Sequence, residues 1–588
     1  MIRNALSLLA TLSLAGALAC GSSDDDAGAG PDGSPGGDAG AADASSDVPA
    51  ACKPKTDGNP DGLKEVMYLD SIATVYPTAN WRVALEPSTV VNWATFDGPE
   101  PHDSAMLLDL PEAGIEVAGF LVSRRSSSQS ASQEANLAQA LIDAAIPELA
   151  SITPRASGRN ITSLDGFDAV VDTSIELRTT TSMDATELRE LLIPALLARL
   201  GGQVMFPELD WQGGQSRDFI LSMQTLYRAE AGQTIFMGAL TRKLDYDDRH
   251  QATALHANDL ANGSGLTVSA NGEARECEDK VVDQVATADI IWVIDESGST
   301  NNERENIASN AVAFFDKAID YGLDFRMGVT DMNDATMGQF ATRTDTMGTG
   351  ERWLMPEEAE AFAAAIDDPS GESIPGDGGS EHGLTQMQNA LTRHLPRDAS
   401  DPLKIRPDAK VAIILVSDEK PQEVKVSSLL GSGNKEPTPT QAAALEEYLA
   451  PFVELLASEE VVFHLIAEPL PFDDNPCGGY EHGYGYYELA VATGGQMGSI
   501  CQPDLDTTLD AMLDSVVGDA SPLELEYVPI SASITVTRDG VPVPRSREIG
   551  WDYRSGSNSI VFYGMPIDPA NPAEIVVAYR RWEQQVIE

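Results

Sequence analysis

The chain has 588 residues, of which 92 are acidic and 38 are basic, so its formal net charge is −54 at pH 7. This length predicts three or four folded units, because a domain usually holds roughly 100–200 residues. The acidic excess argues against nucleic-acid binding and against docking onto anionic lipid headgroups by charge, since both need a basic surface. It fits a soluble protein whose partners include cations.

The first residues predict an exported protein. Arg3 precedes an apolar run of leucines and small residues that is too short to span a bilayer comfortably, which predicts a signal peptide over residues 1–19. The sequence ALAC at 17–20 resembles a bacterial lipobox, so we expect Cys20 to be lipidated and to become the mature amino terminus. The alternative is ordinary signal cleavage near Ala19, which leaves a free cysteine.

Residues 20–62 are rich in Gly, Ala, Asp, Ser and Pro. Such a segment cannot bury enough apolar surface to fold, and its acidic residues repel one another and extend it. We therefore expect an acidic, disordered tether between the membrane and the folded part. Gly21 and Ser22, rather than Asp, follow the lipidated cysteine, which by common sorting rules favours the outer membrane of a Gram-negative cell envelope.

The cysteines are consistent with export. Of the five in the chain, Cys20 is assigned to the lipid, and the even remainder predicts two disulfides. Cys477 and Cys501 form the obvious local pair, which leaves Cys52 to pair with Cys277. The alternative is that some of these four remain free thiols.

Residues 63–279 are expected to form an α+β domain of no recognised family. Strands are expected at 115–123, 167–178 and 234–241. Helices are expected at 131–149 and 185–200. No catalytic constellation is recognisable in this region.

From 280 to 519, apolar strands alternate with helices, which predicts an α/β fold with a doubly wound, mostly parallel sheet. Buried strands are expected at 288–294, 324–330, 410–417 and 461–467, with helices at 302–321 and 441–457. Ligands bind such sheets beyond the carboxyl ends of the strands, so the polar residues at these ends are the candidate site.

Two carboxylates and two hydroxyls follow two of these strands. Asp295, Ser297 and Ser299 come after the first strand, and Asp418 comes after the third. Carboxylate and hydroxyl oxygens are hard ligands, which suit Mg²⁺, Ca²⁺ or Mn²⁺ better than a soft metal. The sequence therefore predicts a divalent-cation site at this edge of the sheet.

An apolar strand, D-x-S-x-S, a helix and a later strand ending in Asp together resemble the metal-ion-dependent adhesion site (MIDAS) of the von Willebrand factor type A (VWA) domain. The resemblance covers about residues 280–519 and implies a Rossmann-like fold. It implies that Asp295, Ser297 and Ser299 hold the cation, while Asp418 acts mostly through water. It also implies that an acidic side chain of a partner completes the coordination.

The third loop of the site departs from the family. The family usually has T-N-T there, whereas residues 378–385 read GGSEHGLT, with no Thr in the expected place. Ser380, Glu381 or a water must substitute, and the alignment of the following apolar positions slightly favours Glu381. Ligation by Ser380 leaves the ion able to attract an acidic partner, whereas a third carboxylate holds the cation more tightly and attracts such a partner less.

The loop after the strand at 461–467 is rich in Tyr and Gly, a composition typical of binding surfaces. Tyr480, His482 and Tyr484 are the candidate partner contacts. The alternative is that Tyr486 and Tyr487 are the buried start of the next helix.

Residues 520–588 are expected to form a small all-β domain. The pattern there is one of short strands and turns, and Asp539-Gly540 marks a hairpin turn.

These features predict a membrane-anchored protein that binds a protein or cell-surface ligand in a divalent-cation-dependent way, with no nucleic-acid partner and no enzymatic activity. Two alternatives remain. One is an envelope scaffold whose cation is only structural, and the other is an enzyme whose active site lies within residues 63–279.

Overall fold

The structure is a computed structural model, and the chain divides into two compact units, Met1–Ala50 and Ala51–Glu588. The account below concerns the second unit. The structure describes residues 50–54, 64–67, 80–85, 88–98, 103–112, 115–128, 130–156, 160–161, 170–199, 203–209, 211–228, 232–248, 250–267, 273–341, 351–367, 381–431, 437–468, 481–502, 505–555, 557–568 and 570–583.

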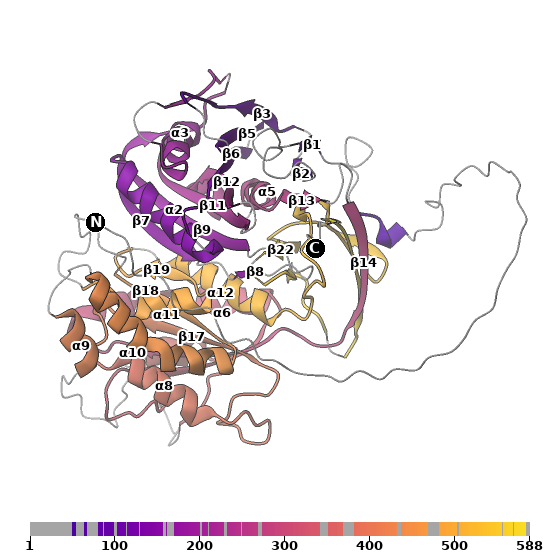
Figure 1. The fold of residues 1–588 in the computed structure, drawn as a ribbon. Helices are drawn as coiled ribbons and strands as arrows, with labels where there is room; N and C mark the ends of the chain where they lie inside the picture. Colours follow the sequence, from indigo (N-terminus) through magenta and orange to yellow (C-terminus); the bar gives the residue numbers. More distant parts are fainter. Residues whose placement is uncertain are drawn as a thin grey trace, which may run out of the picture. The chain divides into compact units, whose positions relative to one another are not determined.

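The largest sheet has eight antiparallel strands in the order β3-β5-β6-β12-β11-β9-β7, with β8 paired to β9 (Figure 1). Its strands are β3 (Val90–Trp93), β5 (Ser104–Glu112), β6 (Ile115–Arg125), β7 (Leu149–Ala156), β8 (Asn160–Ile161), β9 (Val170–Met183), β11 (Ser216–Arg228) and β12 (Gln233–Arg242). Helices cover both faces of this sheet, so both faces of its central strands are apolar and buried.

The alternation of side chains along β6 shows how the two faces are used. Phe120 and Val122 pack in one cluster with α2 (Ala131–Ala145) and α3 (Ala185–Leu196). Leu121 points the other way and packs in a second cluster with α5 (Thr253–Ala261). Gly119 lies where α5 approaches the sheet most closely, because a Cβ there would lie only 1.9 Å from Leu260 Cδ2.

Two small antiparallel sheets and one short helix accompany this region. They consist of β1 (Lys64–Met67), β2 (Asn80–Leu85) and β13 (Ser264–Thr267), of β4 (Thr95–Phe96) with β10 (Val204–Met205), and of α4 (Lys243–Asp247).

A second large sheet has five parallel strands in the order β16-β15-β17-β18-β19. Its strands are β15 (Thr287–Ile294), β16 (Asp324–Asp331), β17 (Lys410–Val416), β18 (Val461–Ala467) and β19 (Met497–Ser499). The helices α6 (Asn301–Asp320), α7 (Ala359–Asp367) and α12 (Asp506–Ala520) pack on one face. The helices α8 (Gly383–His394), α9 (Val424–Leu430), α10 (Pro439–Ser458) and α11 (Tyr486–Thr493) pack on the other face.

The strands at the carboxyl end form two further antiparallel sheets. One sheet has the order β14-β24-β20-β21, from β14 (Glu273–Val282), β24 (Ala573–Trp582), β20 (Thr535–Arg538) and β21 (Val541–Val543). The other pairs β22 (Gly550–Arg554) with β23 (Ser559–Tyr563). Because β14 precedes the parallel sheet in the chain, the carboxyl-terminal strands are completed by a segment from far away in the sequence.

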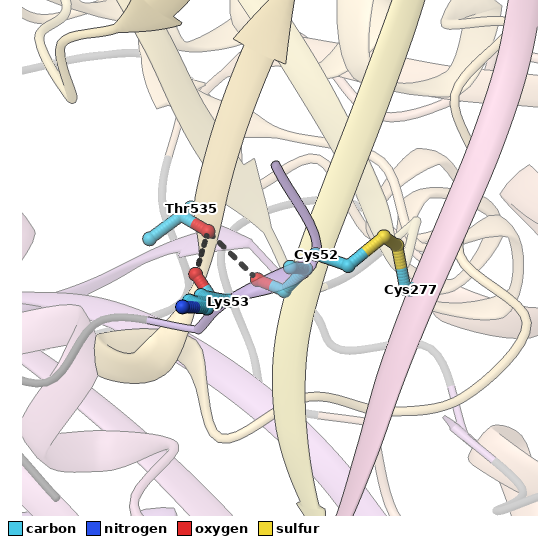
Figure 2. Close-up of a disulfide and its surroundings, with 5 residues drawn as sticks. Cys52, Lys53, Cys277 and Thr535 are labelled. Atoms are coloured by element: carbon cyan, nitrogen blue, oxygen red, sulfur yellow. Dashed lines mark hydrogen bonds between the residues drawn. A yellow bond between two sulfur atoms is a disulfide. The ribbon is translucent and has the colours of Figure 1, made fainter. Parts of the chain in front are cut away.

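A disulfide joins the start of the described chain to this sheet. Cys52, in the short helix η2 (Ala50–Cys52), is bonded to Cys277 on β14 (Figure 2). The neighbouring carbonyl of Lys53 accepts a hydrogen bond of 2.9 Å from the hydroxyl of Thr535. The pairing of Cys52 with Cys277 is the one that the sequence analysis expected. Cys477, the expected partner of Cys501, lies outside the described residues.

The predicted fold class is wrong. We expected an α/β fold with a doubly wound, mostly parallel, Rossmann-like VWA sheet over residues 280–519, flanked by an α+β domain and a small all-β domain. Instead, five of the six sheets formed by the described residues are antiparallel and only one is parallel. Strands were expected at 115–123, 167–178 and 234–241, where β6, β9 and β12 lie. Their pairing into one eight-stranded antiparallel sheet was not expected, because it joins segments that are far apart in the chain. The pairing of β14 with β24 joins distant segments and leaves no local signal in the sequence.

Candidate functional site

The two predicted aspartates lie at the same edge of the parallel sheet. Strands β15 and β17 are neighbours, with Ile294 opposite Val416, so the residues after them emerge together. The backbone nitrogen of Asp295 extends this pairing by donating to the carbonyl of Val416 at 3.0 Å. Asp295 is fully buried, and Asp418 is only 1% exposed.

The loop after β15 holds the Asp295 carboxylate in one orientation. One carboxylate oxygen accepts the backbone N–H of Ser297 at 2.9 Å, and the other accepts the hydroxyl of Ser417 at 2.8 Å. The hydroxyls of Ser297 and Ser299 lie 2.8 Å apart, with Ser299 exposed and Ser297 half-buried. Two hydroxyl oxygens on the solvent side of a fixed carboxylate are an arrangement that can bind a hard cation.

Arg304, on α6, fixes the loop through its backbone. Its guanidinium donates to the carbonyls of Asp295 at 3.0 Å and Ser297 at 2.9 Å, and to the hydroxyl of Thr300 at 2.7 Å. This arginine therefore braces the loop without forming an ion pair with the Asp295 carboxylate.

Asp418, like Asp331 and Glu468 at the same edge, has one carboxylate oxygen that the described chain leaves without a hydrogen-bond partner. Its Oδ1 atom is buried and has no hydrogen-bond partner in the part of the chain that the structure describes. Burial, followed by the charge of Asp295, raises the pKa of Asp418 to about 6. A buried carboxylate oxygen without a partner is costly, and a bound cation is one way to satisfy it.

Glu381 lies in the third loop, close to the other acids. Its Oε2 accepts a hydrogen bond of 2.9 Å from Gln422. Burial, together with the charges of Asp295 and other acids nearby, raises the pKa of Glu381 to about 9. Ser380, the alternative ligand, lies outside the described residues.

Three further acids belong to this edge and were missed by the sequence analysis. Asp331 ends β16, and burial, aided by the charge of Glu296, raises its pKa to about 7. Glu468 follows β18, and burial with the charge of Asp418 raises its pKa to about 7. Glu296 accepts the backbone N–H of Met332 at 3.2 Å, and burial raises its pKa too. Their signal in the sequence is that each lies within two residues of a strand end.

These residues meet the charge requirement of a divalent cation. Within the described ranges, no lysine, arginine or histidine forms an ion pair with Asp295, Asp418, Asp331 or Glu381. The same ranges contain no group of three or more Asp, Glu, His or Cys side chains that could hold a metal ion by themselves. A cation at Asp295 and Asp418 would therefore need the hydroxyls of Ser297 and Ser299, and water, as its remaining ligands.

The expected exposed aromatic surface is not found where its residues are described. His482 is 4% exposed and Tyr484 is 6% exposed, so neither side chain can serve as an open partner contact. Tyr486 begins α11 and is buried, which is the alternative that the sequence left open for it. The aromatic residues were mistaken for a surface because a Gly-rich sequence does not show which side of a loop packs inward. Tyr480 lies outside the described residues.

The predicted lipidation site, Cys20, also lies outside the described residues. Among the helices that the structure describes, none is both long enough and apolar enough to cross a membrane.

Comparison with known proteins gives no family. No family model matches the chain, and no curated protein matches it. Among solved structures, the human COPII-coat protein Sec24c is similar with 9% sequence identity and a TM-score of 0.23, covering 51% of this chain and 39% of that one. This likeness spans well under half of the Sec24c chain and carries no argument about fold or function. The comparisons therefore leave the VWA resemblance of the cation-site motif untested.

Proposed function

We propose that the carboxyl edge of the parallel sheet binds a divalent cation and uses it to recognise a protein or cell-surface ligand. The ligands would be the carboxylates of Asp295 and Asp418 and the hydroxyls of Ser297 and Ser299, with Ser380 or Glu381 completing the site. The observation that carries the proposal is the buried Oδ1 atom of Asp418, which has no hydrogen-bond partner among the described residues.

The argument for a cation is electrostatic. A buried carboxylate is stable when it is paired or when it becomes protonated, and an unpaired one costs several kcal/mol. Asp418 and Asp331 both have raised pKa values, so the charged form of each is disfavoured as the edge stands. A dication would lower those pKa values and stabilise the edge, as oxygen-rich sites do for Mg²⁺, Ca²⁺ and Mn²⁺.

The argument for recognition rests on access and charge. Ser299 is exposed, so the side of the site that carries the hydroxyls is open to a partner. Two aspartates balance the two charges of the ion, which leaves it able to attract an acidic side chain from outside. Anchoring through a lipid on Cys20 would place this activity at the cell envelope.

Isothermal titration of the full chain with Ca²⁺ and with Mg²⁺ tests the cation. We expect one site in the wild type, no binding heat with Asp295→Ala, and normal binding with Asp316→Ala. Asp316 is a matched control because it is an exposed aspartate on α6. Equal binding by the wild type and Asp295→Ala would contradict the proposed ligand set.

Capture of partners from envelope extract tests recognition. Capture that is lost both in EDTA and with Asp295→Ala supports cation-dependent binding. Capture that survives both, in a protein that still binds the cation, favours a scaffold with a structural ion. Turnover of phosphate or ester substrates by Asp295→Ala would instead point to an active site elsewhere in the chain.

A further inference from the structure

A polar cavity lies between the eight-stranded sheet, α12 and β22, and none of its lining residues belongs to the cation site. Its volume is about 200 Å³. This is room for roughly six or seven waters at roughly 30 Å³ each, or for one sugar ring. Polar side chains from β9, β11, α5, the residue after α5 and α12 contribute to its walls, among them Ser174, Ser222, Asn258, Asn262 and Ser515.

Hydrogen bonds between distant segments hold the walls of this cavity. Ser555, just after β22, donates to the carboxylate of Asp172 on β9. Arg155, on β7, donates to the carboxylate of Asp247, on α4, at 2.9 Å. The cavity is therefore bounded by groups that are fixed relative to one another, as a preformed binding site requires.

The charges in the walls argue against an anionic ligand. Each of the three arginines that line the cavity already has a carboxylate partner. The pairs are Arg155 with Asp247 at 2.9 Å, Arg547 with Asp552 at 2.8 Å, and Arg554 with Asp514. The lining also holds five aspartates, Asp172, Asp247, Asp510, Asp514 and Asp519, so its acidic groups outnumber its basic ones and disfavour a phosphate or a carboxylate.

The remaining polar groups are arranged to exchange hydrogen bonds with a neutral ligand. The side-chain oxygen of Asn258 accepts the hydroxyls of Ser222 and Tyr246, both at 3.1 Å, which orients its amide. Asp247 Oδ2 and Arg547 Nη2 are buried atoms of the lining residues without a hydrogen-bond partner in the described chain. One is an acceptor and the other is a donor, so a ligand that carries both donors and acceptors would satisfy both.

We propose that this cavity binds a neutral sugar, as a single pyranose or as the terminal unit of a longer glycan. Sugar hydroxyls are uncharged, closely spaced and able to donate and accept at once, which matches walls of amides, hydroxyls and aspartates, whose oxygens accept hydrogen bonds. An apolar ligand would leave these wall groups unsatisfied. The sugar site is independent of the cation, because none of its groups is a cation ligand.

Saturation-transfer difference NMR on the full chain, with glucose, galactose, mannose and N-acetylglucosamine as probes, tests this proposal. Ser174→Leu and Ser515→Leu fill the cavity from β9 and from α12, and neither hydroxyl makes a side-chain hydrogen bond among the described residues. The matched control is Ser309→Leu, an exposed position on α6. Urea unfolding of each variant shows whether it is folded.

We expect transfer to at least one of the four sugars, unchanged by EDTA and by Ser309→Leu, and at least tenfold weaker binding in both cavity variants. Absence of transfer to all four sugars overturns the proposal and leaves the cavity filled by water only. Transfer that survives both cavity substitutions also overturns it, because the sugar would then bind elsewhere. Loss of cation binding with sugar binding retained separates this proposal from the proposed function.

Discussion

The two ends of the parallel sheet differ in whether their buried aspartates form ion pairs. Near the amino end, Asp289 is fully buried on β15, and its carboxylate is held by Arg326 at 2.6 and 2.9 Å and by Arg406 at 2.8 Å. At the carboxyl end of the same strand, Asp295 is also fully buried, and it has no ion-pair partner among the described residues.

The comparison shows that this protein supplies internal counter-charges at one end and none at the other. Where arginines are present, the acid belongs to the permanent structure. Where they are absent, burial and then the charges of neighbouring acids raise the pKa values, as Asp418 and Glu381 show. Because both environments occur in one sheet, the missing positive charge is a local property that points to a ligand supplied from outside.

The largest expected effect is at the amino end. Asp289→Ala leaves the buried Arg326 without its carboxylate and removes one of the two carboxylate partners of the half-buried Arg406. This should cost about 3–5 kcal/mol of unfolding free energy. Urea unfolding monitored by hydrogen exchange of β15 measures this loss. Asp316→Ala, at an exposed site on α6, should change the stability by less than about 0.5 kcal/mol. A small effect of Asp289→Ala would remove the contrast between the two ends.

Adding a cation should stabilise only the carboxyl end. Ca²⁺ or Mg²⁺ at 100 times its dissociation constant should raise the unfolding free energy by about 2.7 kcal/mol. This gain should vanish in Asp295→Ala and be retained in Asp289→Asn, provided that variant is folded. Thermal unfolding with and without EDTA measures this gain in each variant. An equal gain in the wild type and in Asp295→Ala would contradict a cation site at the carboxyl end of the sheet.

Asp418→Asn should act in the opposite direction to Asp289→Ala when no cation is present. Burial and Asp295 raise the pKa of Asp418 to about 6, so at pH 7 its charged form destabilises the folded state. Removing that charge should therefore stabilise the cation-free protein, by about 1–3 kcal/mol, and should abolish the response to the cation.

The pH dependence of this gain checks its cause. A carboxyl group whose pKa is raised on folding binds its proton more tightly in the folded state, so its penalty grows as pH rises from 3.8 through about 6. The gain from Asp418→Asn in EDTA should thus be full at about pH 8, about half as large at about pH 5, and small at about pH 4. A gain that is equal at both pH values would mean that packing, and not charge, explains it.

The smallest expected effect concerns the third loop. Glu381 is held by Gln422, and the described residues contain no group of three acids able to hold a metal by themselves. Burial and nearby acids raise the pKa of Glu381 to about 9, so near pH 7 its carboxyl is mostly protonated in the cation-free protein. Glu381→Gln should therefore weaken cation binding by no more than about fivefold, or about 1 kcal/mol. A loss of more than about a hundredfold in the titration would make Glu381 a direct ligand in place of Ser380.

Much of the local structure could be predicted from the sequence, because apolar runs and helical periods are local signals. The strand expected at 461–467 is β18, and the helix expected at 302–321 differs from α6 by one residue at each end. The placement of Asp295 and Asp418 at one edge followed from two such strands being neighbours.

What could not be predicted depends on contacts between distant segments. The strand ending at 330 in the prediction continues to Asp331, and that single residue hid an acid of the site. The antiparallel sheets depend on pairings such as β14 with β24, and the burial of His482 depends on what packs over its loop. Neither property is encoded in the spacing of nearby residues.

The bond between Cys52 and Cys277 spans 225 residues and makes the intervening chain a closed covalent loop. A protease that cuts once inside this loop would leave both fragments attached to β14, and only a reductant would separate them. A mechanical force applied to the chain before Cys52 would be transmitted through the disulfide to β14 and its partner strand β24. The eight-stranded sheet would then bear none of that force.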